Sequence, residues 1–80
     1  MSSFDIKNNQ DLDYQETASQ FYEALTEYLI LKDRYEEPIE AVNLRKQAEE
    51  TLRLDHNDYI TAFNFLSTAL KLFKAYNDLS

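Results

Sequence analysis

The sequence contains no glycine and no cysteine, and it has a single proline and a single histidine. Phosphate-binding loops, dinucleotide-binding turns and nucleophile elbows need glycine where the backbone takes positive φ or a ligand approaches closely. Without cysteine there are no disulfides, and one histidine without thiolates does not make a structural zinc site. These classes are therefore excluded in their usual forms, and the tight glycine-based hairpins of β proteins are disfavoured.

Long apolar runs are also missing. No stretch approaches the roughly 20 consecutive apolar residues that span a bilayer. The first residues, MSSFDIKNNQD, lack the apolar core of a signal peptide. We therefore expect a soluble, cytoplasmic protein with no membrane partner.

Basic residues are scarce in the first half of the chain. The formal net charge is −7, with ten acidic and three basic residues up to Glu40 and five of each from Ala41 onward. Direct nucleic-acid binding needs clustered Lys and Arg, so it is disfavoured. The imbalance would attract a basic partner, although net charge also serves solubility alone.

The length, 80 residues, predicts one domain. Residues 1–10 show no apolar periodicity, so we expect a flexible N-terminal tail there and a single helical domain over residues 11–80. Disulfides and zinc are not available to stabilise so small a core, which leaves oligomerisation as the means of adding buried surface.

The segment 58–79 predicts a helix with two apolar stripes. One stripe is Tyr59, Ala62, Leu66, Ala69, Phe73 and Tyr76, and the other is Thr61, Phe65, Thr68, Leu72, Ala75 and Leu79. With Phe63 and Leu70 included, the apolar arc is roughly 200° wide, against about 100° for a helix that faces one side of a core. This helix needs at least two neighbours.

Two further helices are predicted, over about 12–35 and 38–54. The first carries an apolar stripe of Tyr14, Ala18, Phe21, Leu25 and Tyr28. Lys32 falls in line with this stripe, and the stem of its side chain is expected to lie along apolar surface. Pro38 suits the first position of the second helix. There, Arg45, Glu49 and Arg53 have the i,i+4 spacing of ion pairs on the outer side. Asp55 or Asn57 is expected to cap the third helix.

Short turns make neighbouring helices antiparallel, so the fold class is all-α, an up-down-up three-helix bundle. The middle helix has a narrow apolar stripe, half of it alanine, and is too short to cover both long helices. Two copies are therefore expected to pair into a larger bundle. The residues predicted to make this self-association are Phe65, Leu72, Tyr76 and Leu79.

His56 is the only candidate for acid–base chemistry, lying between Asp55 and Asp58. A histidine oriented by a carboxylate would be a general base, but the chain has no cysteine nucleophile and no glycine-built oxyanion site. A turn histidine near the C-terminal end of a helix explains the residue more simply. We assign no catalytic, cofactor-binding or metal-binding residue.

The composition then favours a binding role. Six tyrosines and five phenylalanines are many for one small core, and tyrosine suits half-buried interfaces. We expect a small non-enzymatic regulatory or adaptor protein that acts as a homodimer through helical protein–protein contacts. We expect a protein partner, for which the negative charge favours basic residues, to meet the exposed residues Glu16, Glu23, Glu27 and Ile30. The alternative is an acidic inhibitor that mimics nucleic-acid charge and blocks a basic nucleic-acid-binding protein.

Overall fold

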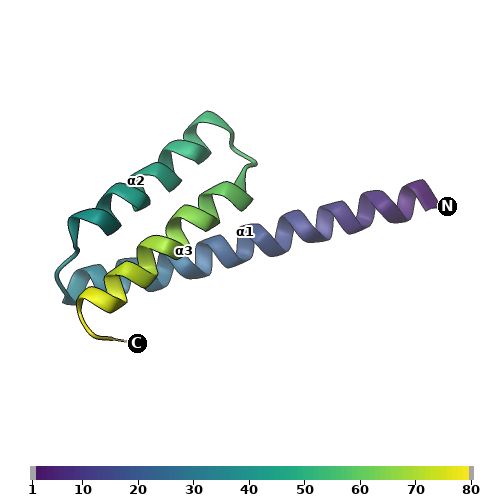
Figure 1. Ribbon diagram of the computed structural model, residues 1–80. Helices are drawn as coiled ribbons and strands as arrows, with labels where there is room; N and C mark the ends of the chain where they lie inside the picture. Colours follow the sequence, from purple (N-terminus) through teal and green to yellow (C-terminus); the bar gives the residue numbers. More distant parts are fainter. Residues whose placement is uncertain (1, 80) are drawn as a thin grey trace.

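The computed structural model describes the backbone of residues 2–79 and the side chains of residues 14–79. It contains three helices, α1 (Ser2–Arg34), α2 (Ile39–Leu54) and α3 (Tyr59–Tyr76), and no strand within the described backbone. In Figure 1, α1 and α3 run in the same direction, and α2 runs in the opposite direction. The prediction of an all-α chain of three helices is confirmed.

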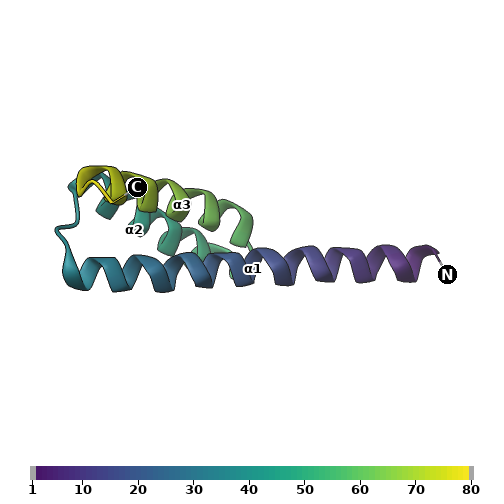
Figure 2. The same cartoon turned by 90° about the horizontal axis from the view of Figure 1, so that it is seen from below.

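The last helix lies at the centre of the fold. α3 packs along both α1 and α2, whereas within the described residues the backbones of α1 and α2 do not approach each other. Figure 2 shows the α2–α3 hairpin lying on one side of α1. The chain itself thus provides the two neighbours that the wide apolar arc of α3 requires. The arc by itself therefore does not require a second copy of the chain. Pairing of two copies stays a prediction.

The core follows the first apolar stripe of α3. Among residues 14–79, eight are at most 3% exposed: Phe21, Tyr28, Ala41, Ala48, Ala62, Leu66, Ala69 and Phe73. The two α2 members are alanines, whose small side chains let α2 approach α3 closely. Phe65 and Leu72, from the second stripe of α3, are half-buried and pack against this core. Both stripes of α3 therefore take part in the intramolecular packing.

The first helix is longer than its apolar pattern predicts. It begins at Ser2, inside the segment expected to be a tail, and its N-terminal part extends beyond the α2–α3 hairpin (Figures 1 and 2). The longest dimension of the molecule, 51 Å, is set by this helix, since its residues rise about 1.5 Å each. Mobility of residues 1–10 in solution stays a prediction.

The helix ends differ in detail from the predicted caps. Pro38 is the N-cap of α2 rather than its first residue, with φ −68° and ψ 150°. α3 is capped by Asp58, whose Oδ1 accepts a hydrogen bond of 3.1 Å from the backbone N–H of Thr61. Asp55 instead accepts from the N–H of Asn57 within the turn. Naming Asp55 or Asn57 as the cap was wrong, because only Asp58 directly precedes the first helical turn.

The C-terminal end of α3 is closed by a Schellman motif without glycine. The N–H of Leu79 donates to the carbonyl of Lys74 at 2.8 Å, and the N–H of Asp78 donates to that of Ala75 at 3.2 Å. This motif places one residue in the left-handed region, and here that residue is Asp78, with φ 58°. Leu79 consequently lies in the cap. Its assignment to the second stripe had placed it on the helix.

Candidate functional site

An open groove runs between α1 and α3. Its lining residues are Gln20, Glu23, Ala24, Glu27, Phe63, Ser67 and Leu70, around a hollow of about 550 Å³. Ala24, Phe63 and Leu70 are half-buried and pack against the core, so they form an apolar floor. Glu23 and Glu27 are exposed and line the α1 side. We call this site the α1–α3 groove.

The groove has an excess of negative charge on its α1 wall. Glu27 pairs with Lys74 of α3, with 2.7 Å between Oε2 and Nζ. Glu16, Gln20 and Glu23 form no hydrogen bond or ion pair with another residue whose side chain is described. The carboxylate of Glu23 therefore faces the groove with its charge uncompensated.

The residues predicted to bind a partner are all exposed, and two of the four line the groove. Glu23 and Glu27 line the groove. Glu16 is exposed on α1, two helical turns before Glu23. Ile30 is 52% exposed and does not line the groove. The structure thus brings Glu23 and Glu27 beside an apolar floor, whereas Glu16 and Ile30 lie on α1 outside the groove lining.

The floor residues of α3 were missing from the predicted site. Phe63 and Leu70 were counted only as part of the wide apolar arc, although their spacing of seven residues places them on one flank of α3. Periodicity shows that flank, but it does not say which helix lies against it. The information needed was the rotation of α1 about its axis, which the packing of Phe21 and Tyr28 determines.

The residues predicted for self-association also fall in different environments. Phe65 and Leu72 pack against the core. Tyr76 is 57% exposed, and its hydroxyl donates a long hydrogen bond of 3.3 Å to Oε2 of Glu36. Leu79 is half-buried beyond the end of α3. Self-association through these four residues stays a prediction.

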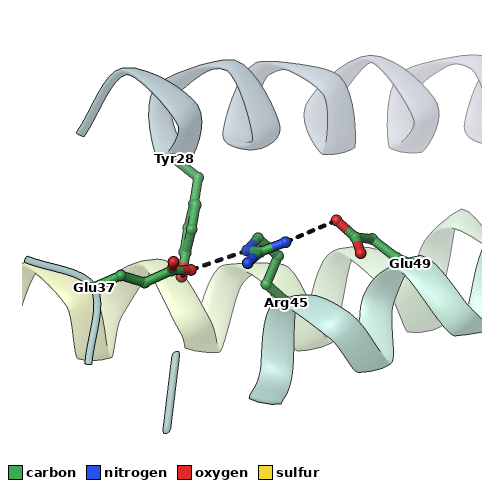
Figure 3. Close-up of polar contacts among 4 residues, drawn as sticks. All are labelled: Tyr28, Glu37, Arg45 and Glu49. Carbon is green, nitrogen blue, oxygen red and sulfur yellow. Dashed lines mark hydrogen bonds and ion pairs between the residues drawn. The ribbon is translucent and has the colours of Figure 1, made fainter. Parts of the chain in front are cut away.

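A polar cluster ties α1 to the turn before α2 (Figure 3). The hydroxyl of Tyr28 donates to Oε2 of Glu37 at 2.5 Å, and Nε of Arg45 donates to the same oxygen at 2.9 Å. Nη1 of Arg45 also donates to Glu49 at 3.0 Å, and the guanidinium lies 5.9 Å from the ring centroid of Tyr28. The prediction that Arg45 lies on the outer side of its helix was wrong, because Glu37 draws it inward.

The electrostatics of this cluster follow from burial and charge. Burial, together with the hydrogen bond to Glu37 and its negative charge, raises the pKa of Tyr28 well above its ordinary value. Burial alone would raise the pKa of Glu37, but the hydrogen bonds from Tyr28 and Arg45 and the charge of Arg45 lower it below the ordinary value. Glu37 is thus held as a carboxylate, and its contacts join α1 and α2 to the turn at Pro38.

Tyrosines also gather where α1 meets the start of α3. The ring centroid of Tyr59 lies 5.6 Å from that of Tyr14 and 5.7 Å from those of Phe21 and Tyr22. The Tyr22 and Tyr59 hydroxyls are 2.9 Å apart. This hydrogen bond, with burial and the nearby phenols, raises the pKa of Tyr59 to about 12. These tyrosines accordingly form contacts within the chain.

His56 lies exposed in the turn between α2 and α3. The flanking carboxylates are engaged elsewhere, Asp55 with the N–H of Asn57 and Asp58 with that of Thr61. Neither is therefore an orienting partner for the imidazole. Among the described side chains, no three His, Asp or Glu residues gather as metal ligands. Within the described residues, no helix has the length and apolar content needed to cross a bilayer.

Comparison with known proteins finds no matching family model, no matching curated protein and no matching solved structure. The class that the fold and site define is a small all-helical domain with an open, acidic groove between two helices.

Proposed function

We propose that the protein is a small non-enzymatic adaptor or regulator that binds a segment of another protein in the α1–α3 groove. The observation that carries this proposal is the combination of the apolar floor, Phe63 and Leu70, with the uncompensated carboxylate of Glu23 beside it. An apolar centre with a polar rim is the usual anatomy of a protein-binding surface.

The shape of the groove favours a macromolecule over a small ligand. Sites for small molecules enclose most of the ligand surface, whereas this hollow is open to solvent along one side. Its lining residues occur on successive turns of both helices, so it is elongated. An elongated open groove between helices suits an extended or helical segment, which fills its length without needing enclosure.

The proposal is tested with a matched pair of substitutions on α3. Ser67→Arg places a long cationic side chain in the groove, and Thr68→Arg places the same side chain on the adjacent exposed position. Proteins captured from the native host by the tagged chain are compared for both variants. We expect partners of the parent chain to be kept by Thr68→Arg and lost by Ser67→Arg. Equal retention by both variants would exclude the groove as the binding site.

One observation favours the nucleic-acid mimic as a second candidate. Glu16 and Glu23 lie on the same helix, both exposed and both without a described partner, in a chain of net charge −7. A charge mimic would use this acidic surface without needing the apolar floor. Homodimerisation and a cytoplasmic location accompany both candidates as predictions from the sequence.

A further inference from the structure

The spacing of the lining residues gives the groove the form of a seat for a helix. On α1 the wall residues Gln20, Glu23 and Glu27 are on successive turns, and on α3 Phe63 and Leu70 are separated by two turns. Seven residues of helix correspond to about 10 Å. Two parallel helices present ridges and grooves into which the side chains of a third helix fit. Ala24, the small floor residue from α1, leaves room for an apolar anchor.

The sign of the charge restricts the occupant further. On the α1 side a partner meets Glu23, and Glu16 lies further along the same helix, neither with a described counter-ion. On the α3 side it meets Ser67, which is neutral. An acidic segment would be repelled, whereas Lys or Arg beside the anchor would form a charge-assisted hydrogen bond with Glu23.

In the ion pair at one end of the groove, Lys74 competes with the cations of a partner for the carboxylate of Glu27. Lys74 and Glu27 are 34% and 48% exposed, and their pair joins α3 to α1. Pairs this exposed contribute little to stability, so a second cation from a partner can exchange with Lys74. The carboxylate of Glu27 is occupied in the free protein and becomes available when Lys74 is removed.

We propose, on the basis of the function proposed above, that the occupant is a basic amphipathic helix of another protein. Its apolar face lies on Ala24, Phe63 and Leu70, its cations face Glu23 and Glu27, and Lys74 weakens binding by holding Glu27. This goes beyond a general binding role, because removal of a groove-edge lysine is expected to strengthen the interaction.

The test uses the full chain and a fluorescent designed peptide. The peptide is about 18 residues long, enough for a helix to form on binding. It has Leu at i, i+3, i+4 and i+7 and Lys beside this face, and a control peptide has Glu in place of each Lys. Binding is measured by fluorescence anisotropy. We expect the basic peptide to bind and Glu23→Gln to weaken it about fivefold, while Lys74→Gln strengthens it about twofold.

Matched controls separate groove binding from general attraction to an acidic protein. Asp33→Asn removes one exposed charge from the same helix outside the groove and is expected to change affinity less than Glu23→Gln. Circular dichroism verifies that each variant keeps its helices. Equal effects of Asp33→Asn and Glu23→Gln, no gain with Lys74→Gln, or equal binding of the acidic peptide would each overturn the inference.

Failure of this inference is distinguishable from failure of the proposed function. Absence of peptide binding, while Ser67→Arg still abolishes capture of a native partner, would overturn the basic helix and leave the groove as a site of different specificity. Peptide binding that Ser67→Arg leaves unchanged would place the peptide outside the groove, which would overturn the inference directly.

Discussion

The hydroxyl of Tyr28, on α1, donates a 2.5 Å hydrogen bond to the carboxylate of Glu37, one residue before the proline that caps α2. Tyr28 is fully buried, and the Glu37 side chain is only 12% exposed. This bond fixes the direction in which the chain leaves α1. The α2–α3 hairpin, and with it the α3 wall of the groove, depends on that direction.

The first prediction concerns this bond. Tyr28→Phe keeps the aromatic contact with Phe73, whose ring centroid is 5.2 Å away, and removes only the hydroxyl. Because Glu37 then loses a donor in a largely buried position, we expect the free energy of unfolding to fall by about 1 to 3 kcal/mol. Urea denaturation followed by circular dichroism measures the change. Tyr35→Phe, at an exposed tyrosine, is the control, and an equal effect there would contradict the argument.

The second prediction is the pH dependence that Glu37 confers. The folded protein lowers the pKa of this carboxyl below its ordinary value of 4.5, chiefly through the hydrogen bonds from Tyr28 and Arg45, which outweigh burial. Below 4.5 the unfolded chain binds the proton more readily, so stability is present above that pH and is lost as the pH falls through the folded pKa.

Denaturation midpoints between about pH 6 and pH 3 test this linkage. We expect Glu37→Gln to flatten the acid limb of the stability curve. Glu50→Gln serves as the comparison, because the exposed Glu50 pairs only with Arg53 on the same helix. Its effect on that limb is expected to be smaller. An unchanged acid limb in Glu37→Gln would show that the cluster does not determine acid stability.

The third prediction concerns the end of α3. Asp78 occupies the left-handed position of the Schellman motif, at φ 58°, where a side chain with a Cβ is strained and glycine is not. Asp78→Gly is therefore expected to stabilise the protein by about 0.5 to 1 kcal/mol. Asp78→Ala is expected to destabilise it, since alanine tolerates this conformation less well than aspartate. Thermal melts of both variants give the signs, and stabilisation by alanine would contradict the assignment.

The fold was predictable where the signal is local. The stripe that contains Leu66 and Phe73 depends on a period of about 3.6 residues, which any helix imposes. The wide apolar arc that it forms with the second stripe predicted two neighbours for α3, and α3 packs against both α1 and α2. The start of α1 was not predictable in this way, because its backbone continues as a helix through residues 2–10, where the apolar pattern is absent.

The site depends on relations between helices that a periodic pattern does not contain. The periodic pattern predicts the helix flank on which Glu23 lies and the one on which Phe63 lies. Only the packed structure brings those two flanks together. Arg45 shows the same difficulty. Its spacing to Glu49 indicated a surface pair, which exists, yet its short contact to Glu37 depends on how the Pro38 turn folds back.

The fourth prediction concerns the homodimer. Phe65→Asp is a poor probe because Phe65 packs against the core, so the substitution is expected to unfold the chain. Tyr76→Lys is sharper, since Tyr76 is 57% exposed. Light scattering at micromolar concentration is expected to give twice the mass of the chain, and Tyr76→Lys to reduce it without loss of helix. A monomeric mass for the parent chain would contradict the dimer, and an unchanged dimer in Tyr76→Lys would contradict the residue assignment.

The last prediction separates groove binding from nucleic-acid mimicry through a second arginine substitution. Ser67→Arg and Glu16→Arg both add positive charge, but only Ser67 lines the groove. A charge mimic loses affinity with either variant, more so with Glu16→Arg, which also deletes an acidic group. Its binding also weakens steeply with salt, because exposed charges are screened over about 10 Å at 0.1 M ionic strength.

Binding through the apolar floor responds differently, because burial of Phe63 and Leu70 against a partner is independent of ionic strength to first order. We therefore expect the affinity of a captured partner to fall with Ser67→Arg far more than with Glu16→Arg, and to keep most of its strength at high salt. Calorimetric titration of both variants at two salt concentrations measures this difference. The reverse order, with a steep salt dependence, would identify the acidic surface of α1 as the working site.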